Sequence, residues 1–277
     1  MHRSYLFAPG HNAKLLRRVF EAGADAVILD LEDAVPPDAK KQARVMVAAV
    51  LAERSAWVRI NTVRTGLAAA DLDAVAGLAA GIRLPKAESA DDVQWAADRA
   101  PGTPLICVIE SARGLLAAPE IAAVPGVRHL SMGGFDLRGD LGAGDGNLQT
   151  LYARSHIVVA SRAAGLGPPI DSVYPRLDDD LGLRYQAGFA RSLGFFGKSA
   201  IHPRQLEVIH DVFTPSAQEL TWAQAVLDAF AAAGGNAVKL PDGEFVGLPV
   251  ADRARRLLEL AGRRPAGADA PGEYVSG

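Results

Sequence analysis

The stretch AVILDLEDAV, residues 26–35, begins as an apolar run and then places Asp30, Glu32 and Asp33 within four positions. A continuous apolar run of this length is typical of a strand that is buried on both faces, as in a parallel sheet. Three carboxylates at the end of such a strand are either solvated turn or helix-capping residues, or groups that hold a cation. The rest of the chain decides between these interpretations.

Apolar runs of this kind recur along the chain, and segments of helical periodicity lie between them. The eight strand candidates are SYLFAPG from Ser4, AVILDLED from Ala26, AWVRIN from Ala56, GIRLPK from Gly81, PLICVIES from Pro104, VRHLSMGG from Val127, PPIDSVY from Pro168 and LGFFGKSAIHP from Leu193. Eight β/α units in succession predict an α/β fold, a TIM (β/α)8 barrel. A doubly wound open sheet is the rival, but no glycine-rich dinucleotide fingerprint follows the first strand.

The predicted barrel occupies residues 1–213. A C-terminal helical extension follows at residues 214–262, with helices predicted in SAQELTWAQAVLDAFAAAG from Ser216 and VADRARRLLELAG from Val250. The last segment, residues 263–277, is rich in Gly, Ala and Pro, and we expect it to be a disordered tail.

Composition narrows the classes of function. The 277 residues are 49% hydrophobic, so the chain can bury a large core. The formal net charge of −3 provides no basic field for nucleic acid, and no apolar run approaches the ~20 residues of a membrane span. The only cysteine, Cys107, excludes an internal disulfide framework, and the N-terminus has no leader pattern. We therefore expect a cytoplasmic protein that binds neither nucleic acid nor membranes.

Polar side chains gather where the predicted strands end, which is where a TIM barrel builds its active site. They are Asp30, Glu32, Asp33, Arg59, Asn61, Lys86, Glu88, Glu110, Arg113 and Asp136. So many carboxylates at one mouth repel each other unless a cation is bound, and a carboxylate pair with open water positions is typical of Mg²⁺. Metal binding is the physical explanation that we favour for the opening stretch.

Six segments carry a resemblance to a known family. In order, they are LFAPGHNAKLLRRVFEAGADAVILDLEDAV, VRIN, LPKAES, IESARG, GGFDLRGDLG and GKSAIHPRQ. Together they resemble the citrate lyase β-subunit-like proteins of the HpcH/HpaI aldolase superfamily over roughly residues 3–215. The resemblance implies a TIM barrel, a homotrimer or hexamer, and Mg²⁺-dependent cleavage or formation of carbon–carbon bonds in citryl-, malyl- or citramalyl-CoA thioesters.

Position by position, the resemblance implies Glu110 and Asp136 as metal ligands, with Glu32 and Asp33 holding metal-bound waters. It also implies that Arg59 binds the substrate's carboxylate or aldol oxygen, a role that suits a planar cation that stays charged. The segment that lines the adenine of CoA would be Ile201, His202 and Pro203, with Arg3, Pro9, Gly10 and Lys14 nearby for the phosphates. His202 is accordingly expected to line the pocket rather than to act as a base.

One departure from the family pattern lies in the extension. In the family that the chain resembles, many members carry an Asp just ahead of the last helix, which reaches the mouth of a neighbouring subunit as acid or base, whereas Gly247 stands there in this chain. Because glycine cannot move a proton, we expect condensation of acetyl-CoA with an oxo-acid to be weak. Asp242, Glu244 or Asp252 would be the substitutes if the segment shifts register.

Two other functions stay open at this point. A Schiff-base aldolase would use a lysine near a strand end, with Lys86 or Lys198 as the candidates. A non-catalytic subunit of a larger lyase complex would bind the CoA thioester without turning it over.

Overall fold

The computed structural model describes residues 1–262. The chain divides into two compact units, one formed by His2–Phe213 and the other by Met1 with the residues from Thr214 on. The predicted tail, residues 263–277, lies outside the described residues. Within residues 1–262, no helix has both the length and the apolar character needed to cross a membrane.

The larger unit alternates strands and helices. Its strands are β1 (Ser4–Pro9), β2 (Ala26–Asp30), β3 (Trp57–Arg59), β4 (Gly81–Leu84), β5 (Leu105–Ile109), β6 (Val127–Met132) and β7 (Lys198–Ala200). Its helices are α1 (Ala13–Arg18), α2 (Lys40–Leu51), α3 (Leu67–Val75), α4 (Ala90–Arg99), α5 (Ala112–Leu116), α6 (Ala118–Ala123), α7 (Gly134–Leu141), α8 (Leu151–Ala163), α9 (Asp180–Leu193) and α10 (Leu206–Phe213). Short 3-10 turns are η1 (Val19–Glu21), η2 (Pro37–Ala39), η3 (Leu148–Thr150) and η4 (Pro203–Gln205).

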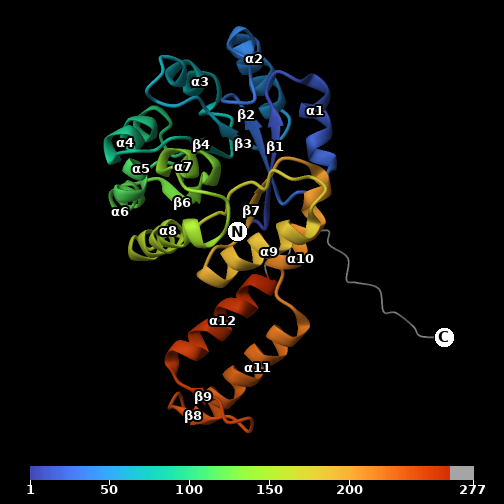
Figure 1. Cartoon of the computed structure of the whole chain (residues 1–277), viewed down its shortest axis with the longest axis vertical. Coiled ribbons are helices and arrows are strands. Elements are labelled where there is room, and N and C mark those ends of the chain that lie inside the picture. Colours follow the sequence, from blue (N-terminus) through green and yellow to red (C-terminus); the bar gives the residue numbers. More distant parts are fainter. Residues whose placement is uncertain (263–277) are drawn as a thin grey trace, which may run out of the picture. The chain divides into compact units, whose positions relative to one another are not determined.

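The strands form one parallel sheet in the order β6-β5-β4-β3-β2-β1-β7. Helices α2, α3, α4 and α8 lie outside the strands (Figure 1). This arrangement confirms the predicted α/β fold with a parallel sheet, in which the crossover helices cover strands that read as unbroken apolar runs.

The strand predicted from Pro168 is the main difference from expectation. Only two parallel bridges form there, Ser131 with Ile170 and Asp171 with Lys198, and they lie between the edge strands β6 and β7. Because Pro168 and its neighbour Pro169 have no N–H, the start of this segment cannot donate to a ladder. Backbone donation begins at Ile170, which bonds the carbonyl of Leu130 at 3.0 Å. The sheet therefore has seven full strands rather than eight.

Side chains on successive strand residues enter two different apolar clusters. The inner cluster contains Tyr5, Ala26, Ile28, Ile106 and Ile170, with Phe7 and Trp57 packed against it. The intervening residues, such as Leu6, Val27 and Leu29, join the larger cluster shared with the helices. Because strand side chains alternate with a period of two, Asp30 follows Ile28 and Arg59 follows Trp57 on the inner side. The inner face thus changes from apolar to charged toward the C-terminal ends of the strands.

Helix caps fix the loops that follow these strands. Ser89 and Ser111 accept hydrogen bonds from backbone N–H groups at the starts of α4 and α5, directly after β4 and β5. Each such cap stabilises a helix start by about 1 kcal/mol. The loops after β4 and β5, which carry Lys86 and Glu110, are therefore held at both ends.

The smaller unit consists of α11 (Ala217–Ala232), the antiparallel pair β8 (Val238–Lys239) and β9 (Phe245–Val246), and α12 (Leu248–Gly262). It has its own apolar core, which includes Ala223, Val226, Phe230, Val246, Ala251 and Ala254. The carbonyl of Gly247 accepts from the N–H groups of Val250 and Ala251 at 3.1 Å, so this glycine stands immediately before α12.

Candidate active site

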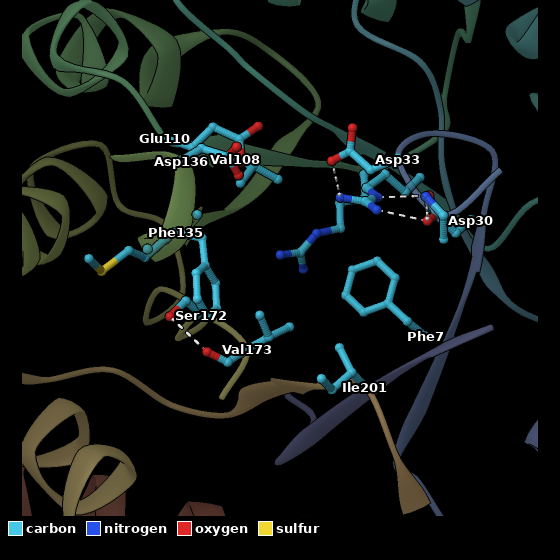
Figure 2. A pocket seen from close by; sticks show the side chains of 16 residues that line it. Phe7, Asp30, Asp33, Val108, Glu110, Phe135, Asp136, Ser172, Val173 and Ile201 are labelled. Atoms are coloured by element: carbon cyan, nitrogen blue, oxygen red, sulfur yellow. Dashed lines mark hydrogen bonds and ion pairs between the residues drawn. The ribbon is translucent and has the colours of Figure 1, made fainter. Parts of the chain in front are cut away.

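A pocket of about 240 Å³ lies at the C-terminal ends of the strands (Figure 2). Most strands of the sheet contribute to its wall. The lining includes Phe7, Asp30, Asp33, Arg59, Arg83, Val108, Glu110, Met132, Gly133, Phe135, Asp136, Ser172, Val173 and Ile201. The structure therefore brings together Arg59, Asp33, Glu110 and Asp136, which the sequence analysis placed in one site.

Asp30 and Arg59 form a bidentate ion pair in the wall of this pocket. Nε and Nη2 of Arg59 each donate to a carboxylate oxygen of Asp30 at 2.7 Å. Burial acts to lower the pKa of Arg59, but the hydrogen bonds and charge of Asp30 raise it overall. Asp30 also accepts from the backbone N–H of Glu32 at 2.9 Å. It therefore fixes both the guanidinium plane and the loop that carries the other carboxylates.

Lys86 connects two acidic side chains at the pocket. Its Nζ donates to Oε1 of Glu32 at 2.6 Å, and its backbone N–H donates to Oε1 of Glu110 at 2.7 Å. Lys86 has a φ of 48°, a left-handed conformation that is unusual for a side-chain-bearing residue. Such strain costs on the order of 1–3 kcal/mol and is typically retained at functional sites.

Glu110 and Asp136 are the pair predicted to hold a metal ion. Glu110 follows β5 and is 7% exposed, whereas Asp136 lies in the first turn of α7 and is exposed. Burial, followed by the negative charges of Glu32 and Asp136, raises the pKa of Glu110 to about 7. A Cβ at Gly133 would lie 2.3 Å from Oε2 of Glu110, so glycine is what leaves room for this carboxylate.

The donor set is suited to a hard cation that keeps water in its coordination shell. Among residues 1–262, no group of three or more His, Cys, Asp or Glu side chains is placed to hold a metal. Two carboxylates with mutual repulsion, together with open pocket volume, match the way Mg²⁺ is usually bound, through one or two carboxylates, waters and substrate oxygens. The site chemistry thus fits Mg²⁺ better than Zn²⁺, which takes nitrogen and sulfur ligands.

Arg83 is a pocket residue that the sequence analysis did not single out. It lies in β4 beside Arg59 of β3 and is 3% exposed. Its Nη2 donates to Oγ of Ser131 at 2.8 Å, whereas Nε and Nη1 have no hydrogen-bond partner among the described residues. Burial, and then the charge of Arg59, lowers its pKa to about 10. The available signal was a charged residue within the otherwise apolar run GIRL.

A second cavity of about 570 Å³ adjoins the first, because Phe7 and Ile201 line both. Three more residues predicted for CoA binding line it, namely Pro9, His202 and Pro203. Nδ1 of His202 accepts from the backbone N–H of Arg204 at 3.2 Å, which agrees with a lining rather than a basic role.

A close backbone contact explains why position 10 is a glycine. Its N–H donates to the carbonyl of Asp30 at 2.8 Å. A Cβ at this position would lie 2.6 Å from the same oxygen, so no larger residue fits without movement. The glycine keeps the end of β1 close to the loop that begins at Asp30.

Arg3 and Lys14, predicted for the CoA phosphates, are not brought to either cavity. Arg3 precedes β1 and is paired with Asp25 at 2.7 Å, whereas the cavities lie at the Pro9 end of the strand. A six-residue strand spans about 20 Å, so Arg3 lies near its opposite end. Lys14 is exposed on α1, and Arg18 of the same helix lines the larger cavity instead.

Schiff-base chemistry needs a neutral amine that can reach the substrate, and each of the two candidate lysines lacks one of these conditions. Burial acts to lower the pKa of Lys86, but the hydrogen bond and charge of Glu32 raise it overall, so the ammonium form is favoured. Burial lowers the pKa of Lys198, but this lysine lines neither cavity, and its Nζ donates to Asp171 at 2.6 Å and to Gln186 at 2.7 Å.

The family model described as HpcH/HpaI aldolase/citrate lyase matches residues 3–203. A (3S)-malyl-CoA thioesterase of Cereibacter sphaeroides is 38% identical over 254 residues, covering 88% of this chain and 89% of that protein. The mitochondrial citramalyl-CoA lyase of Rattus norvegicus is 32% identical and covers 94% and 86% of the two chains.

Among solved structures, the CitE protein of Mycobacterium tuberculosis, in complex with magnesium, acetoacetate and coenzyme A, superposes with a TM-score of 0.80. It is 32% identical, and the match covers 94% of this chain and 97% of that one. The protein therefore belongs to the HpcH/HpaI aldolase/citrate lyase family.

Proposed function

We propose that the protein is a Mg²⁺-dependent carbon–carbon lyase. It cleaves or forms a β-hydroxyacyl-CoA thioester of the citryl-, malyl- or citramalyl-CoA type, with an acyl-CoA and an oxo-acid as the other partners. The observation that carries the proposal is the carboxylate pair Glu110 and Asp136, which forms no ion pair among the described residues, in a pocket that also contains Arg59. The named relatives and the CitE complex support the same chemistry.

Mg²⁺ would be held by Glu110 and Asp136, with Asp33 and Glu32 contacting its waters. When bound, the ion supplies Lewis-acid stabilisation of negative charge on substrate oxygens. Of the second pair, Asp33 lines the pocket, whereas Glu32 is already bound to Lys86 at 2.6 Å and to Arg59 at 2.9 Å. Two cations therefore hold the carboxylate of Glu32 in a fixed position, whereas the carboxylate of Asp33 is held less tightly.

Arg59 would provide a fixed positive charge beside the reacting group. Asp30 holds the guanidinium by two hydrogen bonds, so little reorganisation is needed when negative charge develops on the substrate. The acyl group would occupy the 240 Å³ pocket and the CoA moiety the adjoining 570 Å³ cavity. Phe7 and Ile201, which line both, would lie along the thioester between them.

Three finer statements belong to the same proposal. We infer that Ile170 and Asp171 complete an eight-position TIM barrel, supported by their bridges to β6 and β7. We expect a homotrimer or hexamer in which residues 214–262 pack on a neighbouring subunit, and light scattering of the full chain tests the assembly. A cytoplasmic location agrees with a CoA substrate.

The experiment is a panel of purified hydroxyacyl-CoA thioesters, assayed with Mg²⁺ and with chelator. A lyase releases an oxo-acid together with an acyl-CoA and leaves no free thiol. A thioesterase, the activity named for one relative, releases the CoA thiol instead. Thioester binding without either product would indicate a non-catalytic subunit, and product formation that survives chelator would contradict a metal-dependent reaction.

A further inference from the structure

Arg83 is a buried cation whose hydrogen-bonding capacity is mostly unused. Only Nη2 has a partner, Oγ of Ser131, while Nε and Nη1 have none among the described residues. The other close group is the ring of Phe7, whose centroid lies 5.3 Å from the guanidinium carbon. A guanidinium that is 3% exposed and unmatched by a carboxylate is unfavourable unless an anion binds beside it, because buried charges are normally paired.

The acidic groups near Arg83 already have other hydrogen-bond partners. Asp30 is bound in bidentate fashion by Arg59, and Glu110 accepts from the backbone of Lys86 at 2.7 Å. None of the ion pairs among the described residues includes Arg83. Arg59 stands next to Arg83 on β3, and its charge acts to lower the pKa of Arg83 rather than to neutralise it. The vicinity of Arg83 therefore attracts an anionic group that the protein itself does not supply.

The pairing of charges in the pocket narrows the choice of anion. A divalent cation would offset Glu110 and Asp136, while Arg59 pairs with Asp30 and lies 3.6 Å from Asp33. Arg83 is the cation of the lining that has no ion pair among the described residues, and it faces the pocket that the acyl group would occupy under the proposed function. The substrate oxygens next to the cleaved bond would be taken by the metal, so a different acidic group of the acyl chain would be needed at Arg83.

We propose that Arg83 is a specificity-determining residue that binds a second carboxylate of the acyl group, so that the oxo-acid released is a dicarboxylate. This inference rests on the proposed function and deepens it. It predicts discrimination between two thioesters that differ only at C3 of the acyl chain. Citryl-CoA carries a carboxymethyl group there, and citramalyl-CoA carries a methyl group.

The test compares kcat/KM for these two thioesters in the wild type, Arg83→Met and Arg83→Lys, with Arg64→Met as the control. Arg64 is a half-exposed arginine that lines neither cavity and pairs with Glu88 and Asp92. We expect the wild type to prefer the carboxymethyl substrate by about 10²-fold, the usual scale for leaving a buried donor without its partner. Arg83→Met should bring that ratio to about one, chiefly through loss of the citryl-CoA activity, while Arg83→Lys retains part of the preference.

A parallel binding measurement keeps the inference testable when turnover is too slow to follow. Oxaloacetate and pyruvate are titrated by calorimetry in the presence of Mg²⁺, since they differ by one carboxylate. Arg83→Met should weaken oxaloacetate binding by about 10²-fold and leave pyruvate binding within about twofold. Far-UV circular dichroism and thermal melts check that each variant is folded.

The outcomes separate this inference from the function on which it rests. If Arg83→Met lowers activity on both thioesters by the same factor and leaves their ratio unchanged, Arg83 has a structural role only and the inference is overturned. If the wild type cleaves neither thioester, the proposed function fails, and the oxo-acid titrations alone decide about Arg83. Equal loss of oxaloacetate and pyruvate binding in Arg83→Met would also overturn the inference about Arg83. Selective loss of oxaloacetate binding would support it.

Discussion

Two buried charge clusters in the larger unit differ in how completely they are satisfied. In the first, Asp171 accepts from Arg154 and from Lys198, Lys198 also donates to Gln186, and Nε of Arg154 donates to Thr150. In the second, at the pocket, two nitrogens of Arg83 have no partner, and burial with neighbouring negative charge raises the pKa of Glu110 to about 7. Lys198 of the first cluster and Arg83 of the second belong to strands of the same sheet.

The difference indicates which cluster serves the fold and which serves a ligand. A buried polar network that satisfies its own groups makes the packing specific, whereas groups left without partners lower stability unless something binds. Removing a member of the first cluster should therefore destabilise the protein. Removing a member of the second should change ligand binding or turnover and leave the fold largely unaffected.

The largest effect is expected for Asp171→Asn. The change leaves Arg154 and Lys198 buried without their carboxylate, so the free energy of unfolding should fall by about 3–5 kcal/mol in urea denaturation. Asp178→Asn is the matched control, because Asp178 pairs with Arg204 at 2.5 Å on the surface, and such a pair contributes less than about 1 kcal/mol. Equal losses in the two variants would remove the distinction between the clusters.

The next effect concerns Arg59, where Arg59→Lys keeps the charge but cannot reproduce the bidentate bond to Asp30. Turnover should fall by about 10²- to 10³-fold, the usual cost of one preorganised donor, with CoA affinity nearly unchanged. Steady-state kinetics and a separate CoA titration measure the two quantities, and Arg64→Lys is the control. A collapse of CoA binding would show that Arg59 contacts the phosphates instead.

A smaller effect should appear in the acid dependence of the Asp171 cluster. Burial alone would raise the pKa of Asp171, but the charges of Lys198 and Arg154 hold it below its ordinary value. Its stabilisation is therefore present above ~4, the pKa of Asp in an unfolded chain, and is lost as the pH falls through the lower folded value. The stability gap between wild type and Asp171→Asn should stay constant from about pH 7 to 5 and narrow below about pH 4.

If the stability difference between wild type and Asp171→Asn already narrowed near neutral pH, the lowered pKa of Asp171 would be contradicted. Such narrowing would mean that Asp171 already takes up a proton there, with burial outweighing the two cations. Urea unfolding at several pH values distinguishes the two cases.

The smallest effect is expected for Gly247→Asp in the smaller unit. A Cβ at this position would meet nothing closer than 3.7 Å, and Asp ahead of α12 caps the helix better than glycine by a few tenths of a kcal/mol. Deuterium exchange at the acetyl-CoA methyl should be slow in the wild type and about tenfold faster in the variant, below the 10²–10⁴ of an evolved base. Rapid exchange in the wild type would mean that a base is already present.

The sequence was sufficient to predict the alternation of strands and helices and the gathering of Arg59, Glu110 and Asp136. These features follow from local apolar periodicity and from the rule that parallel strands end at one edge of the sheet. The seven-stranded sheet and its pocket agree with that reasoning. The short bridge at Ile170 was overestimated as a full strand, because the two prolines before it remove backbone donors.

Other features depend on three-dimensional context that a single sequence does not contain. Arg3 is close in sequence to residues of the CoA cavity, but it lies at the other end of β1, where it pairs with Asp25. Arg83 stands inside an apolar run that was interpreted as core. The left-handed backbone of Lys86 has no sequence signal, since such a conformation is enforced by the surrounding contacts.

We assign Glu110 and Asp136, which form no ion pair among the described residues, as the Mg²⁺ site, and a calorimetric titration of Mg²⁺ tests this assignment directly. Wild type, Glu110→Gln and Glu120→Gln are compared, because Glu120 is an exposed glutamate on α6 that lines neither cavity. We predict that Glu110→Gln weakens Mg²⁺ binding by at least about tenfold without lowering the unfolding free energy, while Glu120→Gln binds as the wild type does. Unaltered Mg²⁺ affinity in Glu110→Gln would contradict the assignment of the metal site.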